Sequence, residues 1–395
     1  MPRFEPFPAL RYAPGHDLDE VLAPPYDVLS EADVEAYAAR SEHNIVHVDV
    51  PRGGEDRYER AGALLRQWVA EGVLVRDERP TLTLYRTRFT DETGAARDLV
   101  GVLGALEVVD EGAGGVLPHE RTTPKASTDR FDLTVATRAN LSPVWGLSLA
   151  TGLTALLQEP GEPLGEVTVD GVTHVVERLA EPHRVAAVAA YVSAADVLIA
   201  DGHHRYGVAR RYRDVIRDGT GSRSTAAELT LALVGELVAE QVSIAAIHRL
   251  YRRIPYAALR AALADRFDLE PAPELEPGIL RRMDELGRLV LVGPDGTGEW
   301  LVPKPGAFSG VRALDGSWLE AALVGTEAEV DYQHGVSEVV EAVTGGRAEA
   351  AVLIRPTSIA EIGRTAREGL LMPPKSTFFT PKIRTGVVIR DLATP

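Results

Sequence analysis

A group of nitrogen-rich side chains follows a short apolar run near the middle of the chain, in the segment VLIADGHHRYGVARRYRDV at positions 197–215. The apolar run predicts a strand, and the pattern after it predicts a helix that starts within one or two residues. The first N–H groups of a helix have no partner inside it and lie at the positive end of the helix dipole, so they bind phosphate readily. The residues at this junction are Asp201, Gly202, His203, His204 and Arg205.

Each residue type at this junction has a use in a phosphate site. Gly202 lets the backbone approach a ligand closely, and the two histidines and the arginine add hydrogen-bond donors for phosphate oxygens. Asp201 could cap the helix, hold a histidine in one tautomer or help to place Mg²⁺. The alternative is that Asp201 is only a cap and that His204 and Arg205 are solvated residues of the first turn. On this segment alone both interpretations stay open.

A second polar cluster lies in the stretch PHERTTPKASTDRFDL. Its basic residues could neutralise phosphate, and its histidine and glutamate could exchange protons. So charged a stretch is not expected to form a core element, and a solvated surface loop is the competing interpretation. The candidate residues of this cluster are His119, Glu120, Thr122, Thr123, Lys125, Asp129 and Arg130.

Two further candidates lie in segments that prolines stiffen. In APPYDV the prolines precede Asp27, and a fixed carboxylate suits a general base or a metal ligand, although Asp27 could equally start a turn. In MPPKSTFFTPK, near the C-terminus, two phenylalanines could anchor a phosphate-binding segment or merely hold a surface turn. The candidates of that segment are Lys375, Ser376 and Thr377. His248 stands among apolar residues and is expected to be an ordinary core histidine.

The surrounding sequence predicts helices and hairpins that could position these segments. Apolar residues from Ala61 to Val69 recur at helical spacing, and Gly72 follows where a C-terminal cap belongs. Ser30 and Asp33 are spaced as a short capping box. Alternating stretches predict hairpins at 81–109 and 166–179, the second with an Asp-Gly turn. The helix after the central strand has an expected buried stripe of Val208, Tyr212, Val215 and Ile216.

The order of these elements predicts a mixed α+β fold, because several short hairpins argue against a purely doubly wound sheet. We expect one unit of 395 residues, with lobes at 1–255 and 256–395. The first lobe would hold the phosphate site, and the tail of the second would pack back on it.

Composition excludes several classes of function. Asp and Glu number 58 against 42 Lys and Arg, a net charge of −16 without any basic block, which opposes DNA binding. The absence of cysteine excludes disulfides, thiolate nucleophiles and Cys-ligated metals. Neither a leader nor an apolar run of membrane-spanning length is present, so we expect a cytoplasmic protein that does not enter membranes. The P-loop, Rossmann, HExxH and GxSxG signatures are missing.

Four motifs in order resemble a known family. LAPPYDVLS, HERTTPK, IADGHHRY and MPPKSTFFTPK together are similar to a bacterial and archaeal family known as domain of unknown function ten-fifteen. The central motif also resembles the phosphate loop of the ParB and sulfiredoxin superfamily, which includes free-serine kinases with a D-G-H-H-R loop. The resemblance implies a nucleotide-binding core of that kind, elaborated by hairpins and extra helices, with residues 201–205 gripping nucleotide phosphates. It also implies that Asp27 corresponds to the catalytic carboxylate of those kinases.

The function expected from residues and resemblance together is phosphoryl transfer to a small hydroxyl compound such as free serine. The donor would be ATP, ADP or pyrophosphate with Mg²⁺, and Asp27 or Asp201 would accept the hydroxyl proton. His203, His204, Arg205 and Lys125 would neutralise phosphate. A phosphatase or nucleotide hydrolase and a non-catalytic nucleotide-binding regulator are the alternatives. The substrate would be a small molecule, and the oligomeric state stays open.

Overall fold

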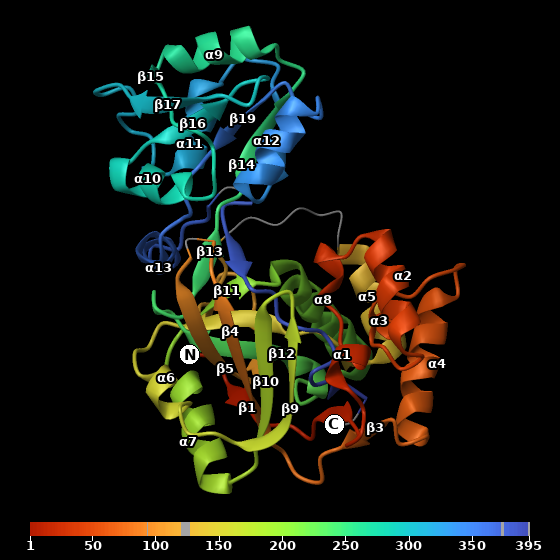
Figure 1. Ribbon diagram of the computed structural model, residues 1–395. Helices are drawn as coiled ribbons and strands as arrows, with labels where there is room; N and C mark the ends of the chain where they lie inside the picture. The colour runs from red at the N-terminus through yellow and green to blue at the C-terminus, as the bar shows by residue number, and fades with distance from the viewer. Residues whose placement is uncertain (93, 120–126, 373–374, 394–395) are drawn as a thin grey trace.

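The computed structural model describes residues 1–395 except 93, 120–126, 373–374 and 394–395. Two large β-sheets with flanking helices give an α+β architecture, as predicted (Figure 1). The larger sheet belongs to what we call the first lobe, residues 1–247 and 355–393. The six-stranded sheet belongs to the second lobe, residues 248–354. Among the described residues, no helix is long and apolar enough to cross a membrane.

The nine-stranded sheet of the first lobe carries the central strand of the candidate site near one edge. In spatial order its strands are β6 (Val116–Leu117), β11 (Val197–Asp201), β8 (Val144–Ser148), β12 (Leu229–Glu236), β5 (Ala96–Glu107), β4 (Leu82–Thr90), β10 (Val172–Leu179) and β9 (Glu162–Val169), with β1 (Phe4–Glu5) paired to β5. Both predicted hairpins are present, as β4–β5 and β9–β10. Asp170 and Gly171 have φ of 53° and 74°, the conformation that a two-residue hairpin turn requires.

Both faces of this sheet are covered, which explains the continuous apolar run of β12. On one face lie α7 (Pro182–Ser193) and α8 (His203–Thr220), which share a core cluster with Phe4, Leu82 and Val100. On the other face lie α13 (Ile359–Arg367) and the C-terminal tail, which pack with Leu103 and Leu231. The tail therefore belongs to the core that holds the candidate site.

A group of helices beside the sheet forms a third core cluster of the first lobe. Ser30 and Asp33 make the predicted capping box, and the predicted helix at 61–72 is present with Gly72 just beyond its end at φ 77°. The cluster contains α2 (Glu31–Arg40), α3 (Val46–Asp49), α4 (Arg57–Ala70) and the small sheet of β2 (Leu10–Tyr12) and β3 (Leu74–Arg76). The short α1 (Leu18–Val21) instead buries Val21 in the cluster that includes the tail.

Two local predictions are wrong. The stretch expected to be too polar for a core element contains α5 (Ser127–Thr137), because Leu133 packs into the third core cluster and Phe131 packs against α8. On α8, Val208 and Tyr212 are buried as predicted, but Val215 is 50% exposed. That part of the helix packs on α5 and on the turn at 226–228, and Val215 is on its outer side.

The second lobe is a sheet between two layers of helices. Its strands in order are β15 (Phe267–Pro271), β17 (Gly298–Pro303), β16 (Leu289–Val292), β19 (Ala350–Leu353), β14 (His248–Arg252) and β18 (Glu329–Gln333). Its helices are α9 (Tyr256–Ala264), α10 (Ile279–Leu286), α11 (Asp315–Ala322) and α12 (Val336–Thr344). The edge strands β15 and β18 were not predicted, because their mostly exposed residues lack the apolar alternation of a strand.

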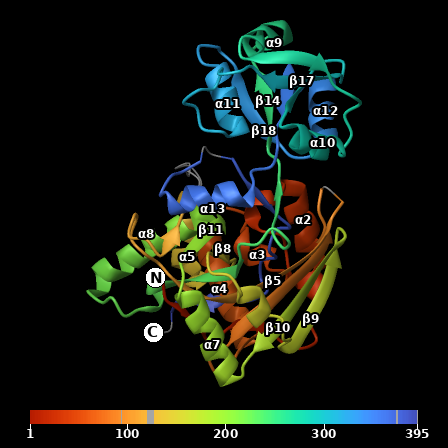
Figure 2. The same ribbon diagram turned by 90° about the vertical axis from the view of Figure 1, so that its left-hand side faces the viewer.

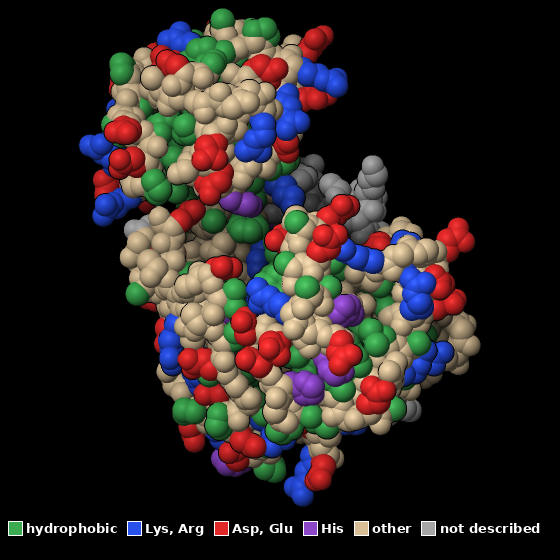
Figure 3. All heavy atoms as spheres, turned by 45° about the vertical axis from the view of Figure 1, so that its right-hand side comes forward, with side chains coloured by type: hydrophobic (Ala, Val, Ile, Leu, Met, Phe, Trp, Pro, Cys, Tyr) green, Lys and Arg blue, Asp and Glu red, His purple; other side chains and the backbone are tan. Residues whose placement is uncertain are grey.

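Two segments join the lobes, at 245–248 and 354–358 (Figures 1 and 2). Beside the first of them, β13 (Ser243–Ala245) pairs with β20 (Phe378–Thr380) of the tail. This pairing holds the tail in the region between the two lobes, where Figure 3 shows basic and histidine side chains. The second sheet begins at His248, and the predicted lobe boundary at 255 stays a prediction. That the two lobes are separate folding units stays a prediction.

Candidate functional site

A cavity of about 640 Å³ lies where the two lobes meet. Its volume is in the range of cavities that bind small molecules. The first lobe contributes residues 26–28, residues 200–205 and four residues of the tail, and the second lobe contributes Asp331, Tyr332 and His334. The predicted phosphate segment and part of the predicted tail segment therefore face one cavity.

The junction of β11 and α8 has the backbone geometry of an anion site. Gly202 has a φ of +87°, which L side chains rarely adopt, and no side chain of the described residues caps the helix that follows. A Cβ at this position would lie 3.0 Å from Nε of Arg205. The glycine is thus required here, and the first-turn N–H groups of an 18-residue helix are available to a ligand.

The Asp201 carboxylate does not cap α8. Its Oδ2 accepts from Arg205, and its Oδ1 accepts from Nζ of Lys382 at 2.5 Å. Burial disfavours the charged carboxylate, but Arg205 and Lys382 outweigh burial and hold the pKa of Asp201 at about 2. Asp201 is therefore ionised at neutral pH and already paired with two cations.

The two histidines of the junction have ring nitrogens without partners. Nε2 of His203 and Nε2 of His204 are both buried, and neither has a hydrogen-bond partner among the described residues. Burial, followed by the nearby His119, lowers the pKa of His203 to about 3, so this ring is neutral at pH 7. As a neutral ring, His203 can offer a ligand one hydrogen bond but no positive charge.

His119 is a buried connection between segments and not a ligand of the cavity. It is fully buried, and its Nδ1 donates to the carbonyl of Ile199 at 2.7 Å while its Nε2 accepts from Oγ1 of Thr377 at 2.8 Å. Its carbonyl accepts from the N–H of Met372, and its ring lies 4.9 Å from that of His203. Burial lowers the pKa of His119 to about 4. His119 was expected to bind phosphate or exchange protons. In the structure both of its ring nitrogens are bonded within the protein, and it does not line the cavity.

Arg130 and Asp129 are likewise bound elsewhere. Arg130 donates to the carbonyl and carboxylate of Asp49, pairs with Asp129, and stacks on the ring of Tyr26 at 4.2 Å. Asp129 also accepts from Tyr58. Arg130 and Arg205 line a separate cavity of about 50 Å³, so the two segments are neighbours, but Arg130 does not face the larger cavity. Glu120, Thr122, Thr123 and Lys125 lie outside the described residues.

Asp27 lies at the wall of the larger cavity, in the turn that follows Pro25. Pro25 precedes a single turn of 3₁₀ helix, η1 (Tyr26–Val28), and this turn forms part of the cavity wall. The residue is exposed, in contrast to Asp201. It therefore presents a carboxylate at the cavity with access for an incoming molecule.

The tail contributes more than the sequence predicts. Lys375 and Thr377 line the larger cavity, whereas Ser376 lines a second one and its carbonyl accepts from Thr357. The residue that sequence analysis missed is Lys382, the last residue of the motif MPPKSTFFTPK, whose Nζ also lies 4.3 Å from the ring centre of Phe378. Phe378 in turn stacks on His334 of the second lobe at 3.7 Å. Lys382 is recognised as a residue of the candidate site by its pairing with Asp201, which is 181 residues away in the sequence.

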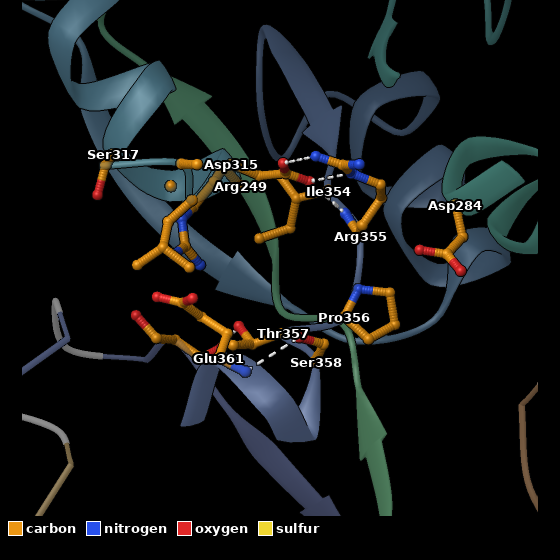
Figure 4. A pocket seen from close by; sticks show the side chains of 14 residues that line it. Arg249, Asp284, Asp315, Ser317, Ile354, Arg355, Pro356, Thr357, Ser358 and Glu361 are labelled. Carbon is orange, nitrogen blue, oxygen red and sulfur yellow. Dashed lines mark hydrogen bonds and ion pairs between the residues drawn. The ribbon is translucent and has the colours of Figure 1, made fainter. Parts of the chain in front are cut away.

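The second cavity, of about 270 Å³, lies between the lobes beside the first. Figure 4 shows Arg355 joined to Asp315 and the start of α13 at Ser358, which caps the helix through the N–H of Glu361. Arg249 reaches toward it and donates to the carbonyls of Ile247 and Lys375. His248 is buried as expected, and its Nδ1 accepts from the N–H of Ile354. Within the described residues, no group of three or more His, Cys, Asp or Glu could hold a metal ion.

Comparison with known families identifies the chain. The model of a family described as "Protein of unknown function (DUF1015)" matches residues 4–317. The chain belongs to this family. The description of DUF1015 assigns no activity, and a search of curated proteins found no match.

Solved structures that match this DUF1015 chain do so at low sequence identity and low TM-score. A free serine kinase in complex with AMP is 12% identical, with a TM-score of 0.37, over 69% of this chain and 88% of the kinase. A conserved hypothetical protein from Pyrococcus furiosus is 11% identical, with a TM-score of 0.38, over 70% and 94%. SbnI with C-terminal truncation from Staphylococcus aureus is 12% identical, with a TM-score of 0.39, over 74% and 88%.

Proposed function

We propose that the protein is a phosphotransferase that moves a phosphoryl group from ATP, ADP or pyrophosphate to a small hydroxyl compound such as free serine. The observation that carries the proposal is the start of α8 at Gly202, which no described side chain caps and which opens on a cavity of about 640 Å³. Backbone N–H groups at such a helix end bind phosphate, and the adjacent Asp201 holds Lys382 beside them. The family is named for its unknown function, so the geometry is the main support.

The residues divide the chemistry of such a transfer between them. The start of α8 and the cations beside it would hold the donor phosphates and neutralise charge as the bond to the leaving group breaks. Asp27, exposed at the cavity wall, would accept the proton of the acceptor hydroxyl as its oxygen attacks phosphorus. The second lobe closes the remaining side and limits the access of water, which would otherwise compete with the acceptor.

The described residues do not by themselves fit a resident Mg²⁺. Asp201 is already paired with two cations, and no three-ligand group is found in the described part of the chain. Mg²⁺ commonly reaches such sites bound to substrate phosphates and keeps several waters. We therefore assign it to the nucleotide or pyrophosphate and not to a set of protein ligands.

Two other activities would use the same geometry. A hydrolase would place water where the acceptor hydroxyl is proposed, and a regulator would bind nucleotide without turnover. The exposed Asp27 favours transfer or hydrolysis, since a sensor needs no carboxylate at that wall. Cytoplasmic location and the lack of DNA binding remain part of the proposal and rest on composition.

Phosphorus NMR separates these activities. Purified protein is incubated with Mg²⁺ and ATP, ADP or pyrophosphate, with and without a panel of amino acids and sugars. A phosphotransferase produces a new phosphate ester only when its acceptor is present. Inorganic phosphate alone identifies a hydrolase, and saturable calorimetric binding without turnover identifies a regulator. If none of the three donors binds, the proposed site is wrong.

A further inference from the structure

We propose that Lys382 binds the phosphoryl group being transferred and that Asp201 is the positioning residue that aims its ammonium group. This inference deepens the proposed function and rests on it. It assigns the charged contact to a residue 181 positions from the loop that binds the phosphates through its backbone.

Two contacts and burial fix the position of the Lys382 side chain. Its Nζ donates to Oδ1 of Asp201 at 2.5 Å and lies 4.3 Å from the ring centre of Phe378, and its side chain is 13% exposed. An ammonium group has three donors, and the contacts with the carboxylate and the ring leave capacity for a ligand. Lys382 lines the same cavity as Gly202 and His203.

Arg205 cannot take this role without losing its present contacts. One of its terminal nitrogens donates to the carbonyl of Pro143 and the other to Asp201. Its Nε is buried without a partner among the described residues, and the position of a Cβ on Gly202 lies 3.0 Å from it. The carboxylate of Asp201 thus separates two cations, with Arg205 held by the protein backbone and Lys382 held beside the cavity.

The use of lysine in this chain is an independent observation. Only four of its 42 basic residues are lysines, so positive charge is supplied almost everywhere by arginine. Three of the four, Lys125, Lys375 and Lys382, lie in the two motif segments that the sequence associates with phosphate. The fourth, Lys304, belongs to the second lobe and donates to the carbonyl of Ala264. A lysine where the rest of the chain uses arginine indicates a need for a compact ammonium group.

The identity of the contact can be tested in the unmodified protein with an acyl-phosphate derivative of ATP. A lysine amine near the terminal phosphate attacks the acyl carbon of this reagent, forms an amide and releases ATP. We expect mass spectrometry to find the label on Lys382, to lose it when excess ATP is present, and to find Lys304 unlabelled. Labelling of Lys375 in place of Lys382 overturns the inference and leaves the proposed function standing.

Variants give a second measurement, which also serves for a pyrophosphate donor. Calorimetry with ATP and with pyrophosphate compares Lys382→Gln, Lys382→Arg and the matched control Lys304→Gln. We expect Lys382→Gln to weaken donor binding at least tenfold and to lower transfer about a hundredfold or more, Lys382→Arg to restore binding in part, and the control to match the wild type. Unchanged donor affinity in a folded Lys382→Gln protein overturns the assignment. Failure of the wild type to bind any donor contradicts the proposed function itself.

Discussion

Three carboxylates line the cavity, and their partners decide what each can do. Asp331 pairs with Arg252 of the second lobe. Asp201 is ionised and shared between Arg205 and Lys382, so it has little capacity to accept a proton from a substrate. Its low pKa of about 2 also makes it a weak base. Asp27 lies on a stiff turn and is exposed at the cavity wall. We therefore propose that Asp27 accepts the proton and that Asp201 orients the two cations.

The substitution Asp27→Asn tests this division. We expect the affinity for the phosphate donor to change little, because Asp27 is not part of the helix end that holds the phosphates. Transfer should fall by about a hundredfold or more, the usual scale for the loss of a general base. Calorimetry and steady-state kinetics measure the two quantities separately. Normal turnover, or a loss of donor affinity, would show that Asp27 has a structural or metal-binding role.

The junction of β11 and α8 could be predicted from sequence because its requirements are local. The end of the strand, the glycine and the start of the helix are consecutive in the sequence, and the positive φ of Gly202 follows from that geometry. The surroundings of His119 could not be predicted in this way. Its burial depends on the carbonyl of Ile199 and the hydroxyl of Thr377, which are 80 and 258 residues away. The role of Lys382 could not be predicted either, because its partner Asp201 is 181 residues away.

Gly202→Val tests the role of the helix end. A β-branched side chain is strained at a φ of +87°, and its Cβ would crowd Arg205. We expect calorimetric binding of ATP, ADP and pyrophosphate to be lost while far-UV circular dichroism stays native. The matched control is Gly207→Ala inside α8, where a Cβ meets nothing within 4 Å. The control should keep binding and gain up to about 1 kcal/mol of stability. Native binding by the Val variant would refute the helix-end site.

His119 predicts a pH dependence of stability. In the unfolded chain an imidazole has a pKa of about 6.5, and burial lowers the pKa of His119 in the folded protein to about 4. Between these values the unfolded state binds a proton that the folded state does not, so stability falls as pH is lowered from about 6.5 to about 4. The contribution of one such histidine is on the order of 3 kcal/mol over that interval.

The measurement is urea unfolding at a series of pH values for the wild type, His119→Gln and His183→Gln. We expect the slope of stability against pH to fall by about one proton in the His119 variant, whereas the exposed His183 should leave the wild-type profile. An unchanged slope in His119→Gln would mean that the histidine is already accessible to protons in the folded protein.

At the scale of the whole molecule, the site belongs to neither lobe alone. The proposed phosphate end comes from β11, α8 and the tail, while Asp331, Tyr332 and His334 come from β18 and the residue after it. The class of the fold was predictable because hairpins and helical periodicity are local. The closeness of β18 to the phosphate loop was not, since an exposed edge strand carries no apolar signal and its place depends on the two connecting segments.

A ligand that contacts both lobes should restrict the motion of one lobe relative to the other. This motion can be measured with spin labels, because the chain has no cysteine and introduced cysteines are labelled selectively. Spin labels on cysteines introduced at the exposed Glu42 of the first lobe and Val324 of the second report the distance between the lobes. We expect ATP with Mg²⁺ to narrow the distance distribution, because Gly202 and Tyr332 line one cavity and a ligand that contacts both would favour the arrangement in which they do. The control pair, Val324 and Leu286 within the second lobe, should not change. If the distribution between the lobes is the same with bound nucleotide, the second lobe is a fixed wall of the cavity and the exclusion of water depends on the acceptor alone.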